Sequence, residues 1–277
     1  LNEIKKVKNK NLLVGAAIGT NQEDLDRAKA LLDNGADLIV IDTAHGHSSK
    51  VLDILSKIKK IINKTPICVG NIATGEAATR LYNSGADIIK VGIGPGSICT
   101  TRMVAGIGVP QITAIIEVKK ALKGKSTKII SDGGIKFSGD IAKAIAAGAD
   151  AIMMGSIFAG TDESPGKKFK IKNKFYKQYR GMGSIGAMSS GSSNRYFQKN
   201  YKDKSKFVPE GVDGRVEFKG NVSKIIYQLK GGLRSSMGYI GAKNLKDIKK
   251  NAKFVKITKA GFYESMVHSV EMIEPTL

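Results

Sequence analysis

Short runs of apolar residues alternate along the chain with stretches in which apolar positions recur at helical spacing. Runs of strand length occupy six segments, at positions 12–19, 37–44, 66–73, 87–94, 128–134 and 151–158. Helical spacing fills the intervals at 21–34, 48–63, 75–84, 111–123 and 138–147. This alternation is typical of βαβ units and a parallel sheet. Because the six runs lack polar alternation, we expect both faces of each strand to be buried.

A short repeat marks the points where three helices give way to strands. The tetrapeptides NGAD, SGAD and AGAD occur at 34–37, 84–87 and 147–150. Glycine readily takes the left-handed backbone conformation that ends a helix. The repeat therefore predicts three helix ends built in the same way.

Polar or glycine-rich clusters follow the carboxyl ends of the predicted strands. They read DTAHGHS, GNIATGE, GIGPGSICTT, SDGGI and MGSIFAG. Active sites of (β/α)₈ barrels lie at this end of the strands. The pattern therefore predicts an α/β fold of the TIM (β/α)₈ type, of which six βα units are visible.

The strand and helix pattern breaks down between positions 161 and 241. This stretch is rich in Lys, Gly and Tyr, and it is too long for a simple connection. Connections of that length are usually functional lids or disordered. The segments RGMGSIGAM (180–188) and SSNRYFQ (192–198) are glycine-containing, as mobile lids often are. We therefore expect a long flap and no further barrel unit here.

Composition favours one large core in an intracellular protein. The 277 residues include 42% hydrophobic residues and 32 glycines, with no long uncharged apolar run and no signal-peptide pattern. The net charge of +21 raises the question of nucleic acid. The lysines are scattered on amphipathic segments such as ILSKIKKII, so a solvated surface is favoured and a nucleic-acid partner is not expected.

Cys99 is the candidate nucleophile. It lies in GIGPGSICTT, where three glycines give a substrate room to approach, although an incidental cysteine in a turn is the alternative. Cys68 lies in the apolar run PICVG, where an inert buried thiol is usual. With only two cysteines, a disulfide framework is excluded.

Several other polar residues at predicted strand ends have both a chemical and a structural interpretation. Asp132 and Asp42 suit ribose hydroxyls, and helix capping is the alternative for Asp132. The residues MGS at 154–156 could donate to a phosphate or simply end a strand. His45 and His47 invite a metal, but no carboxylate or cysteine spacing completes a site. The adjacent Arg195 and Tyr196 could act on a water or form a surface pair.

Taken together, these segments resemble the IMP dehydrogenase family from VGAAIG at 14–19 to ESMVHSV at 264–270. The loop GIGPGSICTT is followed by further matching residues, namely Arg102 and those at 104–106, 108–111 and 113–114. The resemblance implies that the six units are strands 3 to 8 of the barrel. It also implies three regions, with nucleotide and NAD sites in 1–160, a lid in 161–241, and a C-terminal helix and tail at a subunit interface in 242–277.

The implied reaction is the NAD-dependent oxidation of IMP to XMP in guanine nucleotide biosynthesis. Cys99 attacks C2 of the hypoxanthine ring, hydride passes to NAD⁺, and the resulting thioimidate is hydrolysed. The resemblance makes Arg195 the general base of hydrolysis and gives Thr101 and Tyr196 the task of holding the water. An arginine base is unusual because the pKa of its guanidinium exceeds about 12.

The resemblance also implies the binding residues. The phosphate falls to Ser97, Gly134, Gly155, Ser156 and Tyr179, the ribose to Asp132, and the base to Met182, Gly183 and Glu210. NAD falls to Asp42, Thr43, Ala44, Asn71 and Gly92. A potassium ion would be held by the carbonyls of Gly94, Gly96 and Cys99 and by Glu264, Ser265 and Met266 of a neighbouring subunit in a cytoplasmic homotetramer. Position 266, where bacterial relatives commonly carry histidine, is methionine here.

Two features depart from the family pattern. The first two barrel strands and the regulatory CBS modules do not appear, so we expect the chain to be the second part of a longer polypeptide. Alone, it should be inactive or depend on a separate N-terminal fragment, because six strands leave two open sheet edges.

Two other functions remain as alternatives. A GMP reductase is disfavoured by GMGS at 181–184 and RYF at 195–197. A catalytically inactive nucleotide-binding barrel fragment is disfavoured by the retained Cys99, Thr101, Arg195 and Tyr196.

Overall fold

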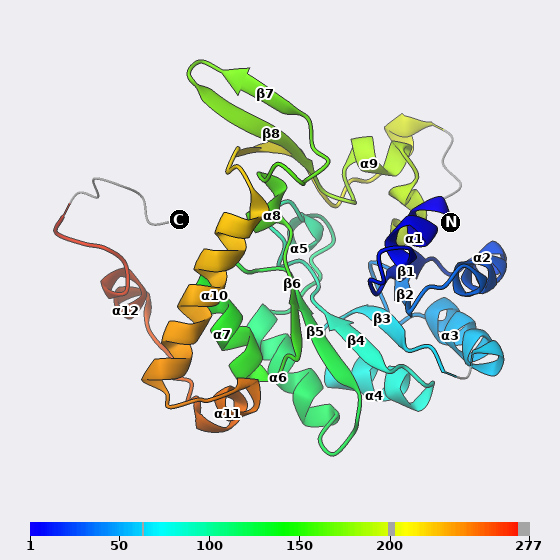
Figure 1. Ribbon diagram of the computed structural model, residues 1–277, viewed down its shortest axis with the longest axis horizontal. Coiled ribbons are helices and arrows are strands. Elements are labelled where there is room, and N and C mark those ends of the chain that lie inside the picture. The colour runs from blue at the N-terminus through cyan, green and yellow to red at the C-terminus, as the bar shows by residue number, and fades with distance from the viewer. Residues whose placement is uncertain (63, 199–202, 271–277) are drawn as a thin grey trace.

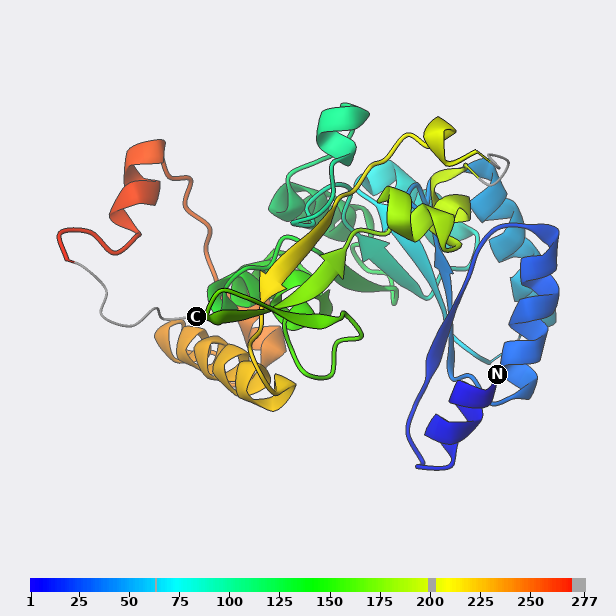
Figure 2. The same ribbon diagram turned by 90° about the horizontal axis from the view of Figure 1, so that it is seen from above.

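Six parallel strands form one curved sheet that makes up part of a TIM barrel (Figures 1 and 2). The computed structural model describes residues 1–62, 64–198 and 203–270. Residues 63, 199–202 and 271–277, which belong to the predicted helix 48–63, the predicted lid and the predicted tail, lie outside them. The strands are adjacent in chain order, namely β1 (Gly15–Ile18), β2 (Leu38–Asp42), β3 (Ile67–Ile72), β4 (Ile88–Val91), β5 (Lys128–Asp132) and β6 (Ala151–Met153). All six predicted strands are confirmed in position and order, although each is shorter than its apolar run.

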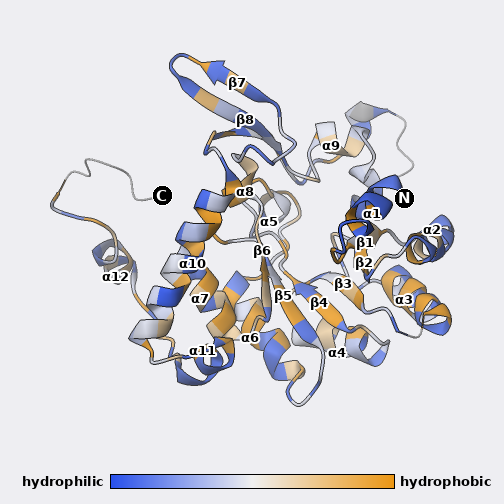
Figure 3. Ribbon diagram, viewed as in Figure 1, coloured by the Kyte–Doolittle hydropathy of each residue, from blue (hydrophilic) through white to orange (hydrophobic). Residues whose placement is uncertain are grey.

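Five helices connect these strands and cover one face of the sheet (Figure 1). They are α2 (Gln22–Asp33), α3 (Ser49–Ile61), α4 (Gly75–Asn83), α6 (Gln111–Ala121) and α7 (Ser138–Ala147), which confirms the predicted helices to within two residues at each end. Ser48 and Thr74 cap α3 and α4 through their hydroxyls. Buried apolar residues of these helices and strands, such as Ile41, Leu55 and Ile58, belong to one hydrophobic core. Their burial is the main source of stability. Figure 3 shows hydrophobic positions along the same helices and strands.

The prediction that every strand is buried on both faces is correct only for the middle of the sheet. All six residues of β3 are buried. In β1, Gly15 and Ala17 are exposed, and in β6 Ala151 and Met153 are exposed. Helices cover only one face, so the opposite face of the two end strands meets solvent. The apolar runs reflect the interior of a barrel that six strands do not close.

The repeated tetrapeptides do end helices through left-handed glycines. Gly35, Gly85 and Gly148 have φ angles of 89°, 97° and 128°. Such angles are accessible to glycine and strained for most other residues. The predicted construction is therefore confirmed in all three copies.

The aspartate of each repeat has a second task that the sequence did not reveal. Its carboxylate accepts the backbone N–H at the start of the neighbouring strand and binds a lysine. The backbone donors to Asp37, Asp87 and Asp150 are Val14, Ile67 and Ile129, at 2.8, 2.8 and 2.9 Å. The lysine partners are Lys8, Lys59 and Lys249, at 2.9, 2.8 and 2.6 Å. The repeat thus joins adjacent strands at their amino ends.

Three short helices at chain turns were not predicted: α1 (Asn2–Lys8), α5 (Thr101–Val104) and α8 (Ser156–Ala159). The last of these corrects the sixth predicted strand, which was expected to continue to Phe158 but ends at Met153. The apolar run continues past this point because α8 also buries Ile157 and Ala159. An apolar run of this length cannot distinguish a buried strand from a strand followed by a helical turn.

The stretch from 161 to 241 contains an antiparallel sheet and a long helix. The sheet consists of β7 (Lys168–Ile171), β8 (Lys174–Arg180) and β9 (Asp213–Glu217), and between its last two strands lie α9 (Ile185–Ser189), η1 (Ser192–Tyr196) and η2 (Lys204–Lys206). As predicted, no strand of this stretch joins the parallel sheet among the described residues, but the prediction of a flap missed α10 (Val222–Tyr239), which packs against α7. Gly231 and Gly232 lower the helix propensity of this segment, so the sequence pattern does not indicate a helix there. Gly232 allows the approach, because a Cβ there would lie 2.0 Å from Oγ of Ser138.

The chain ends in α11 (Leu245–Asn251), which packs against α7, and α12 (Lys259–Glu264), which lies on an extended arm. Both views show this arm projecting away from the rest of the chain (Figures 1 and 2). Among the described helices, none is both long enough and apolar enough to span a lipid bilayer.

Candidate active site

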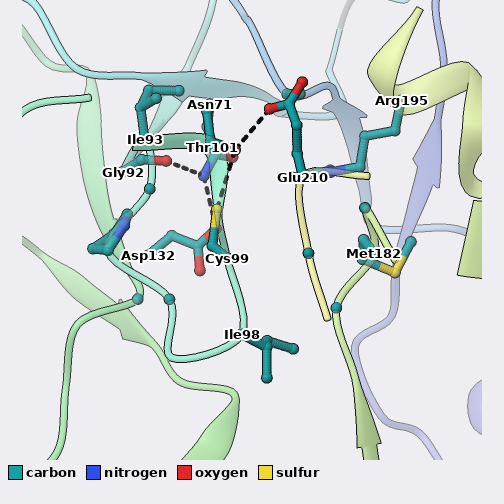
Figure 4. A pocket seen from close by; sticks show the side chains of 18 of the residues that line it. Asn71, Gly92, Ile93, Ile98, Cys99, Thr101, Asp132, Met182, Arg195 and Glu210 are labelled. Carbon is teal, nitrogen blue, oxygen red and sulfur yellow. Dashed lines mark hydrogen bonds between the residues drawn. The ribbon is translucent and has the colours of Figure 1, made fainter. Parts of the chain in front are cut away.

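A cavity of about 220 Å³ lies at the carboxyl ends of the central strands. All four predicted catalytic residues line it, namely Cys99, Thr101, Arg195 and Tyr196. The predicted substrate residues Asp132, Met182, Gly183 and Glu210 line it too. The loop after β4 forms one wall, and segments near 182, 195 and 210 form the other (Figure 4). The fold thus brings together residues that are far apart in the sequence.

Cys99 begins a short chain of hydrogen bonds. Its thiol donates to Oγ1 of Thr101 at 3.2 Å, and the Thr101 hydroxyl donates to Oε2 of Glu210 at 2.7 Å (Figure 4). The backbone reinforces this arrangement, because the Thr100 amide donates to the Glu210 carbonyl at 2.9 Å. A carboxylate is therefore connected to the Cys99 sulfur through one hydroxyl.

Two glycines and an arginine shape the loop that carries Cys99. Gly92 has a φ of 152°, and a Cβ there would lie 2.1 Å from the carbonyl oxygen of Asp132. Gly94 has a φ of 79°, and a Cβ there would lie 2.6 Å from Cγ of Arg102. Arg102 in turn donates to the carbonyl of Val109 at 2.6 Å. The close approaches explain why the loop needs glycine at these positions.

Four side chains from four adjacent strands form a polar network beside the cavity. Lys90 Nζ lies 2.9 Å from Oδ1 of Asp42 and 3.1 Å from Oδ2 of Asp132, and it also donates to Oδ1 of Asn71. Asn71 Nδ2 donates to Asp132 at 2.9 Å and to the Gly92 carbonyl at 2.8 Å. The predicted ribose acceptor Asp132 and the predicted NAD residues Asp42 and Asn71 are therefore held together.

Arg195 reaches from η1 to this network and forms an ion pair with Asp42. The Ala44 amide donates to the Arg195 carbonyl at 3.1 Å. Burial opposes ionisation of Asp42, but the charges of Lys90 and Arg195 hold the pKa of this carboxyl below its ordinary value. Although burial works against the cation, Asp42 raises the pKa of Arg195 above its ordinary value. Arg195, from the predicted lid, is thus protonated and contacts two residues predicted to bind NAD.

Tyr196 packs on the predicted base-binding segment. A Cβ at Gly183 would lie 2.8 Å from Cζ of Tyr196. Burial raises the pKa of the Tyr196 hydroxyl, which therefore stays protonated near neutral pH. The hydroxyl is available as a hydrogen-bond donor at the cavity.

The predicted phosphate residues converge from separate segments. Ser97 Oγ donates to Oγ of Ser156 at 3.2 Å. A Cβ at Gly155 would lie 2.6 Å from the Tyr179 hydroxyl, whose pKa is raised by burial. Gly134 packs on Pro95, two residues before Ser97 in the chain. Hydroxyls and glycine backbone from four segments therefore lie close together, as binding of an anion requires.

The predicted cofactor residue Thr43 and the predicted potassium ligands are placed differently from the residues described above. The Thr43 side chain is buried, and its hydroxyl donates to the Gly70 carbonyl at 3.0 Å. Gly94 and Gly96 line the cavity, whereas Glu264, Ser265 and Met266 lie on the arm that projects away from it (Figure 2). Within one chain, the two halves of the predicted potassium site are therefore not brought together.

The remaining candidates are resolved by their surroundings. The rings of His45 and His47 are 6.3 Å apart, and no group of three His, Cys, Asp or Glu side chains suited to a metal occurs among the described residues. Burial raises the pKa of the Cys68 thiol to about 12, which agrees with the predicted inert role. Sequence reasoning missed Lys90, and it gave no role to Arg102 or to Gln111, whose Nε2 donates to the Val91 carbonyl at 2.8 Å. The signal for Lys90 was a lysine within the apolar run IIKV.

Comparison with known proteins places the chain in a family. The sequence profile described as "IMP dehydrogenase / GMP reductase domain" matches residues 2–268. The chain is 55% identical over 262 residues to an inosine-5′-monophosphate dehydrogenase of Aquifex aeolicus, and 55% identical over 261 residues to one of Chlorobaculum parvum. Each alignment covers 94% of this chain and 53% of the relative, so the chain spans about half their length.

A solved structure gives the same assignment. A GMP reductase of Trypanosoma brucei in complex with guanosine 5′-monophosphate superposes with a TM-score of 0.85 at 43% identity. The superposition covers 94% of this chain and 53% of that one. The chain belongs to the IMP dehydrogenase / GMP reductase domain family.

Proposed function

We propose that this chain carries the active site for the oxidation of IMP to XMP with NAD⁺. One observation carries the proposal: the Cys99 thiol faces a cavity that Thr101 and Glu210 border together with Arg195 and Tyr196. A nucleophile beside groups that can activate water suits a two-step reaction in which a covalent intermediate is hydrolysed. The resemblance to IMP dehydrogenases over 94% of the chain supports the same reaction.

In the first step the Cys99 thiol releases its proton to solvent, the sulfur bonds to C2 of the hypoxanthine ring, and a hydride leaves that carbon. Bound NAD⁺ supplies the hydride acceptor, so the substrate is oxidised while the cofactor is reduced. Ser97, Ser156 and Tyr179 would hold the phosphate, and Asp132 the ribose hydroxyls. This step leaves the purine as a thioimidate on Cys99.

In the second step a water adds to C2, the carbon–sulfur bond breaks, and XMP leaves with the thiol restored. The water must lose a proton to a nearby base. Arg195 is paired with Asp42, which opposes its deprotonation. The Thr101 hydroxyl already donates to the Glu210 carboxylate, which is a better proton acceptor in this arrangement. We therefore assign proton removal to the Thr101–Glu210 pair, with Arg195 and Tyr196 orienting the water.

Asp42, Ala44, Asn71 and Gly92 would hold the cofactor. A carboxylate beside backbone amides at a strand end suits a ribose with two hydroxyls. Because Arg195 contacts both Asp42 and Ala44, the lid and the cofactor ribose would compete for the same groups. Oxidation would then proceed with the lid displaced, and hydrolysis with Arg195 returned to Asp42.

The projecting arm is proposed to pack on a second copy in a homotetramer. Its side chains Phe254, Val255, Ile257, Phe262 and Tyr263 are between 49% and 82% exposed. Such contiguous apolar exposure marks interfaces. A neighbouring arm would bring Glu264–Met266 to the loop holding Gly94, Gly96 and Cys99.

That loop has one property a potassium site needs. The backbone hydrogen bonds that join the loop to residues 210–212 are made by the neighbours of Cys99. The Cys99 carbonyl takes no part in them and can face an ion.

Packing of the arm on a second copy can be tested by light scattering, which should report a larger particle for the wild type than for Val255→Asp. An unchanged mass in Val255→Asp would refute this packing.

The alternative reaction is reductive deamination of GMP, as expected of a GMP reductase. It is favoured by the superposition on the Trypanosoma brucei protein. A lid arginine that reaches the cavity has no evident task in that reaction, because no thioimidate is hydrolysed. We therefore rank the reductase second.

The deciding experiment mixes the full chain with IMP, NAD⁺ and K⁺ and follows NADH absorbance, with Cys99→Ala as the matched control. Intact-mass measurement of both proteins then searches for a nucleotide adduct. NADH formation and an adduct in the wild type alone would support the proposal. Consumption of NADPH with GMP, but no response to IMP, would favour the reductase. Nucleotide binding without either reaction would identify a catalytically inactive barrel fragment.

A further inference from the structure

A buried lysine outside the predicted set lies at the centre of the polar network beside the cavity. Lys90 projects from β4 and is 3% exposed. Its ammonium can donate three hydrogen bonds, and it has three acceptors, on Asp42, Asn71 and Asp132. These acceptors come from β2, from the end of β3, and from β5. One cation thus joins three other strands.

The sheet is built to admit this side chain. Gly70 is the partner of Lys90 in the register between β3 and β4. A Cβ at Gly70 would lie 2.6 Å from Cβ of Lys90, so a larger residue would displace the lysine. A glycine in the middle of a buried strand is costly, and it often marks a close approach of another group. The close approach of Lys90 explains why a glycine stands at position 70 in spite of that cost.

Lys90 lies beside the cavity but does not line it. Asn71 and Asp132 line the cavity, and both bind Lys90. Lys90 is absent from the described lining residues. Any effect of this lysine on a bound nucleotide must therefore pass through the side chains that it holds.

The charges within the network also depend on Lys90. Asp42 and Asp132 are two carboxylates, and within the part of the chain that the structure describes they are contacted by two cations, Lys90 and Arg195. Without Lys90, Asp132 would keep only the neutral amide of Asn71 as its side-chain partner in the network. A partly buried carboxylate without a cation partner is costly, so Asp132 would be expected to reorient.

We propose that Lys90 is a positioning residue that fixes the Asp132 carboxylate for the ribose hydroxyls of the nucleotide and anchors the Asp42 carboxylate that receives Arg195. The proposal rests on the function proposed above and adds to it a residue that does not touch the substrate. It implies that recognition of the ribose hydroxyls depends on the ammonium of Lys90. Recognition of the phosphate, at Ser97 and Ser156, should not.

The test compares the affinity of the full chain for IMP and for 2′,3′-dideoxy-IMP by calorimetry. Wild type should prefer IMP by at least about tenfold, since a carboxylate bound to hydroxyls contributes that much. Lys90→Met should lose most of this preference while its affinity for dideoxy-IMP changes less than about threefold. Asp132→Asn should lose the preference too, and adding Lys90→Met to it should cause no further loss.

Two further variants keep the test decisive. Lys90→Gln keeps one hydrogen-bonding group and should fold even where Lys90→Met does not, and it must show the same loss of preference. Lys59→Met removes the lysine bound to Asp87 at the opposite end of β4, and it should keep the wild-type preference. A merely structural role would weaken both nucleotides equally. Full preference for IMP in the folded Lys90 variants would overturn the inference, whereas failure of the wild type to bind IMP would overturn the proposed function itself.

Discussion

The guanidinium of Arg195 forms an ion pair with the carboxylate of Asp42, and this contact joins η1, in the predicted lid, to the carboxyl end of β2. The same carboxylate binds Lys90 through its other oxygen, Oδ1. Since the Ala44 amide also donates to the Arg195 carbonyl, backbone and side chain of one lid residue both rest on the predicted cofactor segment. The position of the lid is therefore expected to depend on Asp42.

Asp42→Asn should loosen the lid. The amide keeps the shape of the side chain but removes the charge that holds Arg195, so local opening of the segment should become easier. Hydrogen exchange of amides in α9 and η1 should be faster by about tenfold. Mass spectrometry of the corresponding peptides measures this rate. Asp53→Asn, which disrupts only an exposed pair with Lys57 on α3, is the matched control. Identical lid exchange in all three proteins would contradict the assignment.

Thr101→Ala should separate the two steps of the proposed reaction. The Cys99 thiol can lose its proton to solvent without the Thr101 hydroxyl, so the first turnover should still give a rapid burst of NADH. Hydrolysis loses the hydroxyl that joins the site to Glu210, and steady-state turnover should fall about 10²-fold. Rapid-mixing absorbance distinguishes the two phases.

Thr79→Ala serves as the control for Thr101→Ala, because the Thr79 hydroxyl donates only to a carbonyl within α4 on the outer surface. It should preserve both the burst and the steady state. If Thr101→Ala slowed burst and steady state equally, the hydroxyl would act before hydrolysis, and the proposed proton route would be wrong.

The apolar pattern was sufficient to predict the order of strands and helices, because each βα unit forms from residues close together in the chain. It could not locate α10, whose Gly231 and Gly232 reduce its helix propensity. This helix is stabilised by packing on α7, which only the folded chain provides. Sequence alone likewise could not show that Asp37, Asp87 and Asp150 each bind a neighbouring strand.

The candidate site followed mainly from the family resemblance, and the fold shows why spacing alone was insufficient. Thr101 and Glu210 are far apart in sequence, and only the return of the chain beside the loop after β4 joins them. Lys90 could have been noticed as a charge in an apolar run. Its partners Asp42 and Asp132 could not, because they depend on strand register.

Gly92→Ala should destabilise the protein and displace Asp132. The φ of 152° is unfavourable for alanine, and its Cβ would lie 2.1 Å from the Asp132 carbonyl. The combined strain and overpacking should lower the free energy of unfolding by about 3 kcal/mol. Gly231→Ala is the opposite case, because it lies exposed within α10 with free space around it. It should stabilise by about 0.5–1 kcal/mol. Urea denaturation measures both, and a harmless Gly92→Ala would show that the loop can move.

Asp150→Asn should reveal a stabilising contribution that disappears in acid. Burial opposes ionisation, but the bonds from Lys249 and from the Ile129 amide hold the pKa of Asp150 below its ordinary value. A carboxyl with a lower pKa in the folded state stabilises the fold at pH values above its unfolded pKa of about 3.9. This contribution is lost as the pH falls through the lower folded-state pKa, because the protonated carboxyl then resembles the amide of asparagine.

Unfolding free energies of wild type and Asp150→Asn should therefore differ by about 1 kcal/mol at neutral pH. The difference should shrink once the pH falls below about 4, since the carboxyl is then progressively protonated in the unfolded chain and afterwards in the folded one. Asp53→Asn, on the exposed surface of α3, should change the unfolding free energy by less than about 0.5 kcal/mol throughout. A difference for Asp150→Asn that did not vary with pH would mean that shape and hydrogen bonding, and not charge, join β5 to β6 at this point. The third copy of the repeat would then stabilise the sheet through its Ile129 bond alone.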